Sequence, residues 1–295
     1  MASPTASVLI PTLCPGPAFD DVLRAVFAQQ PGFDFEVVVV DSGSPPADLD
    51  RMRRFPLRLV EIAPHEFGHG RTRNLLGRLA RGSLLLYLSQ DAQPASVDWL
   101  HTLVAPLEDP NVAGAYAQQL PRADADPLIR FFLARTYGSQ PVRRCVRRNA
   151  RVRIDQIFFS NVSSALRRDV WERYPFREDV VMSEDQYWAY DVLAAGYQVV
   201  YEPRAQVYHS HNYSLRGLFR RNWQSGASLR GLIADPPLAI GRRGLAYVAG
   251  QAGYLLRSGR AHWLPYMLLY EATKAAGFGL GMRFGQAGMV KGTSP

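Results

Sequence analysis

Three short apolar runs, each followed by a polar turn, constrain the fold of this chain most strongly. They span residues 7–11, 35–40 and 83–88, and helix-like stretches at 20–30 and 72–80 lie between them. The second run is rich in valine, which favours strands, whereas the helical stretches place apolar residues three and four positions apart. Strands joined by crossovers of helical length pair in parallel. The sequence therefore predicts an α/β fold with a Rossmann-like, mostly parallel central sheet flanked by helices.

Acidic residues follow two of these runs directly. Asp41 comes after the second run, and Asp91 ends the segment Ser89-Gln90-Asp91 after the third. Ligands of parallel α/β sheets bind beyond the carboxyl ends of the strands, so both acids are candidates for a binding site. A single Asp in a loop is more often the cap of the next turn. Its position after a buried strand is what favours a ligand role for Asp91.

Two further groups of titratable residues lie downstream. Glu184 and Asp185 stand at the start of a helix expected over residues 185–195, where acids also stabilise the helix dipole. His209 and His211 follow an expected strand, so their side chains point to the same side. One carboxylate at a strand end, an imidazole and a separate carboxylate base suit metal-assisted group transfer. Helix capping for the acids and an exposed strand for the histidines are the structural alternatives.

The segment of residues 65–69, HEFGH, formally matches the zinc-binding pattern H-E-x-x-H. That pattern works only on a helix, and Pro64 together with two glycines favours a turn instead. We expect a glycine-rich loop that leads into the helix at 72–80 and can bind phosphate, with Arg71 and Arg73 adding charge. Neither a G-x-G-x-x-G after the first strand nor a P-loop is present, which disfavours dinucleotide-binding and P-loop enzymes.

The middle of the chain is less regular. Further strands are expected at residues 57–62, 112–118, 157–162 and 198–201, and further helices at 97–107 and 185–195. Six arginines lie between Arg143 and Arg153, in a loop or on a solvated helix face. Cys14 and Cys145 are too few for a disulfide framework, so a reducing cytoplasm is expected.

Positive charge is concentrated in the C-terminal third. The chain has 34 Lys and Arg against 26 Asp and Glu residues, and from Tyr201 onward there are 12 basic and 3 acidic residues. This distribution favours an anionic partner such as phospholipid, a lipid diphosphate or nucleic acid, unless it is only a solvated face. The longest charge-free run of the tail, residues 244–256, is too short to span a bilayer, which takes about 20 residues.

Six short segments, in this order and spacing, carry a resemblance to a known family. They are residues 8–12 (VLIPT), 39–44 (VVDSGS), 67–74 (FGHGRTRN), 88–92 (LSQDA), 183–185 (SED) and 207–213 (VYHSHNY). The chain resembles the inverting glycosyltransferases of family 2, which have the GT-A fold, and among them the bacterial rhamnosyltransferases. The resemblance implies a GT-A domain over residues 1–213, with a nucleotide-sugar half at about 1–91 and an acceptor half at 92–213. A helical, basic and amphipathic extension at 214–295 would follow it.

The resemblance also implies a role for each matching residue. The nucleotide-sugar would be bound by Pro11, Thr12, Asp41, Ser42, Gly70, Arg71, Arg73, Asn74, Gln90 and Asp91. The acid-x-acid metal motif of the family is reduced here to Gln90-Asp91-Ala92, so Asp91 and His209 are the expected ligands of Mg²⁺ or Mn²⁺. Asp185 is the expected catalytic base. The acceptor or the diphosphate would be contacted by Glu184, Trp188, His211, Arg220 and Arg221.

The implied reaction moves a sugar from a nucleotide diphosphate donor, dTDP-rhamnose or a UDP-sugar, to a hydroxyl of a saccharide or lipid-linked acceptor in cell-surface polysaccharide synthesis. We expect a cytoplasmic enzyme that is peripheral at the inner face of the cell membrane, contacts an anionic membrane surface, forms a homodimer and binds no nucleic acid. Two alternatives stay open. A catalytically inactive nucleotide-binding scaffold of a glycan assembly complex would share every fold feature. A nucleic-acid-binding protein would explain the basic tail but not the acid-bearing strand ends.

Overall fold

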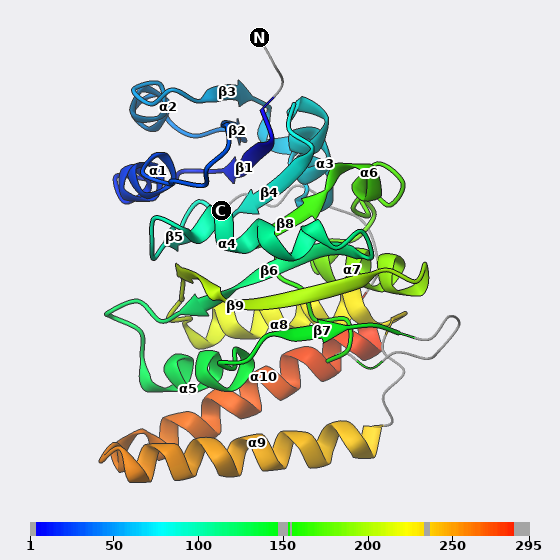
Figure 1. The fold of residues 1–295 in the computed structure, drawn as a ribbon. Helices are drawn as coiled ribbons and strands as arrows, with labels where there is room; N and C mark the ends of the chain where they lie inside the picture. Colours follow the sequence, from blue (N-terminus) through cyan, green and yellow to red (C-terminus); the bar gives the residue numbers. More distant parts are fainter. Residues whose placement is uncertain (1–3, 147–152, 154, 233–236, 286–295) are drawn as a thin grey trace.

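A nine-stranded sheet forms the centre of the molecule (Figure 1). The computed structural model describes residues 4–146, 153, 155–232 and 237–285, with the side chains of helix α9 described from residue 241. The strands are β1 Ala6–Thr12, β2 Phe35–Asp41, β3 Arg58–Glu61, β4 Leu84–Leu88, β5 Gln93–Pro94, β6 Val112–Leu120, β7 Val142–Arg144, β8 Ser163–Arg167 and β9 Gln198–Tyr208. The helices are α1 Phe19–Phe27, α2 Pro46–Met52, η1 Pro64–Glu66, α3 His69–Leu79, α4 Trp99–Val104, η2 Ala105–Glu108, α5 Pro127–Thr136, α6 Arg168–Trp171, α7 Glu184–Ala194, α8 Leu215–Leu229, α9 Pro237–Arg257, η3 Ala261–Trp263 and α10 Leu264–Phe284.

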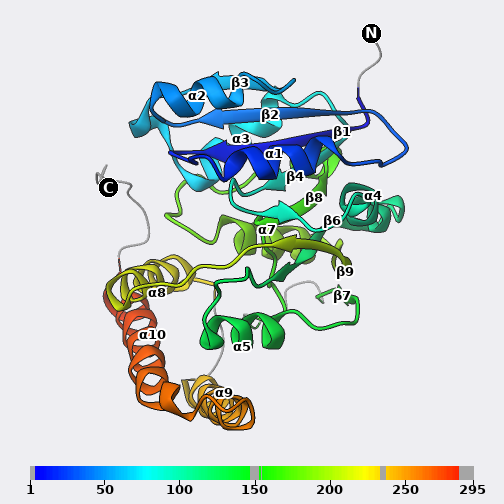
Figure 2. The same ribbon diagram turned by 90° about the vertical axis from the view of Figure 1, so that its left-hand side faces the viewer.

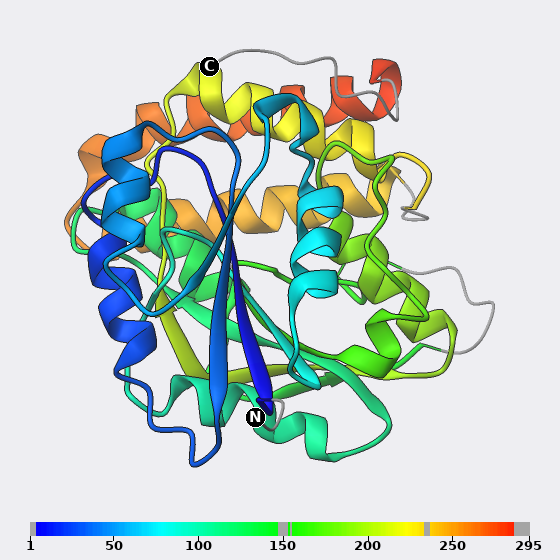
Figure 3. The same cartoon turned by 90° about the horizontal axis from the view of Figure 1, so that it is seen from above.

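The first four strands form the parallel sheet that the sequence predicts. They lie in the order β3-β2-β1-β4, and each neighbouring pair runs in parallel. Helices α1 and α2 cover one face of β1 and β2, and α3 covers the other (Figure 3). Successive residues of β1 therefore face opposite cores: Leu9 packs with the α3 side, and Val8 and Ile10 with the α1 side. Burial on both faces explains why these strands are continuous apolar runs.

Beyond β4 the sheet is mixed rather than mostly parallel. Strand β8 enters between β4 and β6 and is antiparallel to both, whereas β9 runs parallel to β6. Strands β5 and β7 pair with β9 in antiparallel orientation. This arrangement extends the sheet sideways from β4, the strand that Asp91 follows.

The strand predicted at residues 157–162 is wrong. The stretch is irregular, and β8 starts only after it, at Ser163. Ile157 and Phe159 are buried in the core, but the backbone N–H of Asn161 donates to Asp185 of α7 instead of to a neighbouring strand. The prediction failed because these apolar side chains are buried in the core as those of a strand would be, whereas their backbone does not pair with a neighbouring strand.

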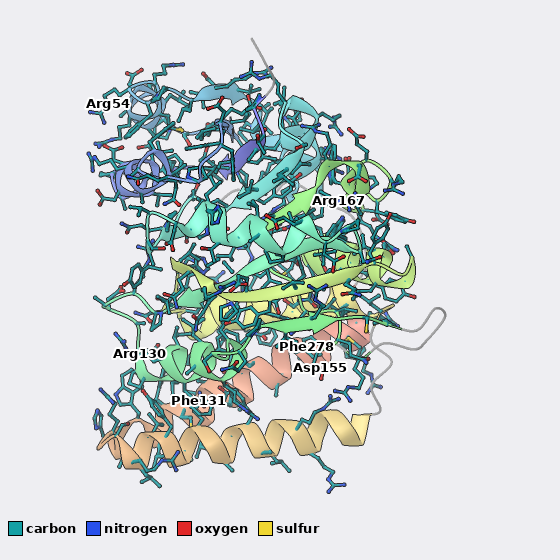
Figure 4. All side chains as sticks on the ribbon, viewed as in Figure 1. Arg54, Arg130, Phe131, Asp155, Arg167 and Phe278 are labelled. Carbon is teal, nitrogen blue, oxygen red and sulfur yellow. The ribbon has the colours of Figure 1, made fainter. Side chains whose placement is uncertain are left out.

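The last three helices form a layer beside the sheet (Figure 2). Helices α8 and α10 touch closely at glycines. A Cβ atom on Gly226 would lie 2.3 Å from the carbonyl oxygen of Phe278, and one on Gly281 would lie 2.2 Å from that of Trp223. On the other side of α10, Phe131 of α5 contacts Tyr247 of α9, with ring centroids 5.3 Å apart (Figure 4). No helix in the described part of the chain is long and apolar enough to cross a membrane.

Two sequence predictions remain partly or wholly open. Helix α8 starts at Leu215, close to the boundary predicted after residue 213, but the division into two units stays a prediction. Of the arginine-rich stretch, Arg143 and Arg144 belong to β7, Arg153 is described, and residues 147–152 lie outside the described part of the chain.

Candidate active site

The loops that follow β1 and β2 are held together by the Asp41 carboxylate. Its Oδ1 accepts hydrogen bonds from two backbone N–H groups of its own turn, and its Oδ2 accepts from the hydroxyls of Thr12 at 2.9 Å and Ser44 at 2.5 Å. The Ser42 hydroxyl donates to the Thr12 carbonyl oxygen at 2.9 Å, next to Pro11 at the end of β1. The structure thus brings Pro11, Thr12, Asp41 and Ser42 together at the strand ends. Asp41 itself is almost fully buried and fixes this turn.

Gln90 connects the end of β4 to the loop after β1. Its Oε1 accepts a hydrogen bond from the backbone N–H of Leu13 at 2.8 Å, and its Nε2 donates to the Leu13 carbonyl oxygen at 3.1 Å. An amide can accept and donate in this way, whereas an ionised carboxylate only accepts. The Gln90 amide therefore fixes the loop after β1, and in the segment Gln90-Asp91-Ala92 the carboxylate that lines the cleft is that of Asp91.

Asp91 lies against both histidines that follow β9. The Nε2 atom of His211 is 3.0 Å from Asp91 Oδ2, and the Nε2 atom of His209 is 3.5 Å from Asp91 Oδ1. The ligand atoms of the three residues all lie within 4.8 Å of one another. His209 was expected beside Asp91, whereas His211 was expected at the acceptor. The structure places His211 in the same cluster, and closer to Asp91.

The protonation states of this cluster suit a metal ion. Burial lowers the pKa of His209 to about 4, so its ring is neutral at physiological pH. Burial opposes the charge of Asp91, but the hydrogen bond from His211 and the field of both histidines lower its pKa to about 2. Neutral imidazoles and an ionised carboxylate are the forms that ligate metals. Two nitrogens and one oxygen suit Mn²⁺ or another transition metal better than Mg²⁺, which prefers oxygen ligands.

The H-E-x-x-H segment does not form such a site. His65 lies in η1 and His69 begins α3, so the two rings do not share one helix. Among the described residues, the group that can hold a metal ion is that of Asp91, His209 and His211. The helix expected from residue 72 starts at His69, three residues earlier, so Gly68 lies before it and Gly70 and Arg71 lie in its first turn; phosphate binding at this place stays a prediction.

Asp185 occupies the first turn of α7 and faces the same cleft. Its Oδ1 accepts from the backbone N–H of Gln186 at 2.9 Å, and its Oδ2 from that of Asn161 at 3.2 Å. Burial, and then the negative charge of Glu184, raise the pKa of Asp185 to about 7. Ser183, just before it, has a φ of 67°, a left-handed conformation that is uncommon outside glycine. Asp185 is therefore a carboxylate that can gain or lose a proton near neutral pH.

Glu184 has the opposite environment. Its carboxylate lies 2.8 Å from the guanidinium of Arg73, and both side chains are almost buried, with 6% and 10% exposed. Burial opposes the charge of Glu184, but Arg73 holds its pKa below the usual value. Adjacent carboxyl groups whose pKa values are driven apart mark a division of roles. Glu184 stays ionised and paired, and Asp185 is the one that can act as a base.

Three residues of α3 contact the segment before α7. A Cβ atom on Gly70 would lie 1.9 Å from the carbonyl oxygen of Arg177, so only glycine fits there. The amide of Asn74 donates to Glu178 Oε1 at 2.8 Å and is buried, and Arg71 is exposed, 3.9 Å from the same Glu178. These contacts position Arg73 beside Glu184. A direct role of Gly70, Arg71 and Asn74 in nucleotide binding stays a prediction.

Of three residues expected to contact the acceptor or the diphosphate, Trp188, Arg220 and Arg221, only Arg221 lines the cleft. Trp188 is fully buried, with its ring centroid 5.0 Å from that of Phe159, so the expectation that it contacts the acceptor or the diphosphate is wrong. Arg221 of α8 lines the cleft and lies over the ring of Tyr213, 5.4 Å from its centroid. Arg220 is exposed on the same helix and does not line the cleft.

The metal-type cluster and the acid pair open into one cleft of about 340 Å³. A second pocket, of about 190 Å³, shares His209, His211 and Arg221 with the cleft. Four aromatic side chains line the second pocket, Phe132, Tyr213, Tyr247 and Tyr270, together with four aliphatic ones. Residues that could hold a metal ion, the carboxyl group of Asp185 and aromatic side chains thus lie next to one another.

Three polar residues of the cleft were missed in the sequence. Gln119 of β6, Ser160 and Asn161 line the cleft or bind its acids. Each is a polar residue inside or at the end of an apolar segment, a position where an unpaired side chain is costly. That cost was the available signal for a site.

Comparisons with known proteins agree with this geometry. The profile of Glycosyl transferase family 2 matches residues 7–174. The chain is 31% identical to the O-antigen chain rhamnosyltransferase RfbN of Salmonella typhimurium, over 93% of this chain and 88% of that protein. It is 29% identical to the O-antigen chain rhamnosyltransferase WbaN of Salmonella anatum, over 94% of this chain and 89% of that protein.

Two solved structures show the same fold at low sequence identity. The mannosyltransferase PcManGT of Pyrobaculum calidifontis, in complex with GDP-Man and Mn²⁺, has a TM-score of 0.64 at 21% identity, over 96% of this chain and 88% of that one. TarS 1–349 of S. aureus, in complex with UDP, has a TM-score of 0.56 at 13% identity, over 95% of this chain and 90% of that one.

Proposed function

The chain belongs to glycosyl transferase family 2 and is a glycosyltransferase with the GT-A fold, and on that premise we propose that it transfers L-rhamnose from dTDP-rhamnose to an acceptor hydroxyl with inversion at the anomeric carbon. One observation carries the proposal. A carboxylate with a pKa near neutrality and a metal-type cluster line the same cleft at the ends of the strands.

Asp185 takes the role of the base. The acceptor hydroxyl gives its proton to the Asp185 carboxylate, and its oxygen forms the bond to the anomeric carbon as the bond from that carbon to the diphosphate breaks. The backbone N–H groups of Asn161 and Gln186 orient the carboxylate. A base is most effective when its pKa is close to the operating pH, which supports Asp185 over the permanently paired Glu184.

Asp91, His209 and His211 would hold a divalent cation, Mn²⁺ by their donor set. Such an ion, when bound, supplies positive charge for the departing diphosphate. Arg221 is a second source of positive charge in the same cleft. PcManGT, which has the same fold, was solved with Mn²⁺, and this supports the choice of ion.

The donor and the acceptor are inferred from different observations. The names of the two Salmonella relatives support rhamnose as the sugar. The turn built by Thr12 and Asp41 at the strand ends supports a nucleotide at that place. The aromatic pocket beside His209 and His211 supports a saccharide, free or lipid-linked, as the acceptor, because sugars stack on aromatic rings. The place of action is the cytoplasmic face of the membrane.

Thermal-shift measurements with dTDP, UDP and GDP, each with and without Mn²⁺, test the donor site. Stabilisation by dTDP that increases with Mn²⁺ is expected. Stabilisation by GDP alone would contradict the choice of donor. Release of dTDP from dTDP-rhamnose that depends on an acceptor would separate an enzyme from an inactive scaffold, which binds the donor without turnover.

A further inference from the structure

Helix α10 is apolar on both sides: Met267 and Tyr270 are buried, apolar residues are also exposed, and the ion pair of the helix faces inward. Leu268 and Phe284 are each 59% exposed, and the exposed positions between them hold leucine, alanine, glycine and a single arginine. Lys274 Nζ lies 3.0 Å from Glu271 Oε2, and these side chains are only 26% and 11% exposed. Lys274 also lies over the ring of Tyr247, 5.0 Å from its centroid. A helix that faces water usually has a polar exposed side, whereas α10 is apolar on that side as well.

Helix α9 continues this apolar surface. Leu245 is 73% exposed and Leu256 is 57% exposed, and eleven residues, about three turns, place them on the same side of the helix. Leu245 and Leu268 both line a groove between the two helices. The helices lie at the end of the molecule opposite β1–β3 (Figures 1 and 2). We name the exposed apolar residues of both helices the α9–α10 face: Leu245, Leu256, Leu268, Leu269, Leu280 and Phe284.

The charges around this face are almost all positive. Residues 241–285 contain six basic residues, Arg242, Arg243, Arg257, Arg260, Lys274 and Arg283, and one acid, Glu271, which is turned inward. Asp155, which is 53% exposed and lies 4.0 Å from Arg243, is an acid close to these residues, so the excess of positive charge comes mainly from the other exposed arginines. Exposed leucines flanked by such an excess of arginine are typical of helices that lie in the interface of an anionic membrane. A second copy of the chain would instead bring like charges together.

We propose that the α9–α10 face lies on an anionic lipid bilayer, with its leucines at the headgroup boundary and its arginines on the lipid phosphates. This membrane contact deepens the proposed function, and its role in bringing the enzyme to a membrane-held acceptor rests on that function. The groove between α9 and α10 shares Phe132, Tyr247 and Lys274 with the aromatic pocket beside His209 and His211. An acceptor held at the membrane would therefore lie next to the catalytic cleft.

Flotation of the full chain with vesicles tests this surface. Vesicles of phosphatidylglycerol and phosphatidylcholine should carry the protein at low salt, and phosphatidylcholine alone or high salt should release it. The double variant Leu268→Asp, Leu269→Asp should lower the ratio of bound to free protein by at least ~10-fold, since the membrane affinity scales with the buried apolar area. Val97→Asp replaces a residue that is 54% exposed outside this face and should bind like the wild type.

Equal flotation of the double variant and the wild type would overturn the proposal. Dissociation of a dimer by the double variant in analytical ultracentrifugation, with no vesicle binding by the wild type, would assign the face to a second copy. Turnover of a water-soluble acceptor should be unchanged in the double variant, because neither leucine belongs to the cleft. Absence of turnover in every variant, with normal flotation, would count against the proposed function alone.

A second and independent observation concerns Gln119, at the end of β6. Its Oε1 lies 2.9 Å from Nδ1 of His209, and its Nε2 donates to the hydroxyls of Tyr137 at 2.5 Å and Ser160 at 3.1 Å. In this orientation both hydroxyls accept from the amide nitrogen, and the amide oxygen is the atom next to Nδ1 of His209. That oxygen can only accept, so the hydrogen of the His209 ring lies on Nδ1 and the lone pair on Nε2, the atom that faces Asp91.

We infer that Gln119 is a positioning residue that keeps His209 in the tautomer able to ligate a metal. Partners of this kind typically change metal affinity ~10–100-fold when they are removed. The role rests on the proposed metal site, but the tautomer itself exists without metal or donor. It can therefore be measured separately.

Two variants of Gln119 test this role. Gln119→Leu should weaken binding of Mn²⁺ alone ~10–100-fold in an electron paramagnetic resonance titration, and Gln119→Glu, which still accepts from Nδ1, should restore it. In the metal-free protein, ¹⁵N NMR of the histidine rings should show protonated Nδ1 for His209 in the wild type and loss of that preference in Gln119→Leu. Protonated Nε2 in the wild type, or unchanged Mn²⁺ affinity in the Leu variant, would overturn the inference. The expected tautomer without any Mn²⁺ binding by the wild type would reject the metal site and keep the positioning role.

Discussion

Replacing Asp185 by Asn should lower turnover and, above neutral pH, stabilise the fold. The substitution removes the base while it keeps the size of the side chain, so turnover should fall by at least ~10²-fold. The stabilisation has a different origin. The folded protein raises the pKa of Asp185 to about 7, mainly by burial and then by the charge of Glu184, so ionising this group costs folding free energy.

The size and the pH dependence of this cost follow from proton linkage. The carboxyl group prefers its proton in the folded state, so the cost is absent below about pH 4, grows as the pH rises towards 7, and is then constant. The pKa is raised from 3.8 to about 7, and this corresponds to at most ~4 kcal/mol at about 1.4 kcal/mol per pH unit. Because the cleft admits water, which solvates the charge, we expect Asp185→Asn to gain about 1–2 kcal/mol between pH 5 and pH 8.

Urea unfolding at pH 5 and pH 8, together with initial rates, measures both effects. Glu184→Gln is the matched control, because it also removes one charge from the same turn but leaves the nearly buried Arg73 without its carboxylate partner. The control should therefore be destabilised, by about 3 kcal/mol or more. Near-normal turnover of Asp185→Asn would refute the assignment of Asp185 as the base. A stability difference from the wild type that is the same at pH 5 and pH 8 would contradict the raised pKa.

Three further predictions concern the metal, the rate profile and the glycine-rich loop. Asp91→Asn should abolish the increase in Tm that Mn²⁺ gives to the wild type with dTDP; an unchanged increase would place the ion elsewhere. The kcat/KM of the wild type should fall tenfold per pH unit below about 7 and level off above it, as Asp185 loses its proton with rising pH; a flat profile from pH 6 to 8 would contradict this. Gly70→Ala should lower the free energy of unfolding by about 1–3 kcal/mol, since its Cβ would lie 1.9 Å from the Arg177 carbonyl oxygen. Urea unfolding equal to that of the wild type would show that the start of α3 or the segment at Arg177 shifts to make room.

The parallel strands at the start of the chain could be predicted from local patterns. Strands β1, β2 and β4 are buried on both faces, so each is a continuous apolar run, and the polar residue that follows marks its end. The rule that ligands bind at these ends then identified Asp41 and Asp91. Local sequence was sufficient for these strands because β2 follows β1 in the chain and pairs with it, and β4 pairs with the other edge of β1.

The mixed part of the sheet beyond β4 depends on contacts between distant residues, which no local pattern encodes. Strand β8 inserts between β4 and β6, and the stretch before it folds over the acid pair of α7. The alternation of His209 and His211 showed that they share a side, but not that both face Asp91, about 120 residues earlier. The ring of Trp188 packs in the core. From the sequence alone, an aromatic residue on a helix is as consistent with core packing as with contact to a sugar.

The central claim is that this cleft transfers a sugar with Asp185 as base. The most direct measurement follows dTDP release and acceptor mass together, with the full chain, dTDP-rhamnose, Mn²⁺ and a saccharide acceptor. The account predicts that the acceptor gains one deoxyhexose per dTDP released, that NMR of the product shows an inverted anomeric centre, and that Asp185→Asn binds the donor but does not transfer it. Retention of the anomeric configuration, or equal transfer by Asp185→Asn, would contradict it.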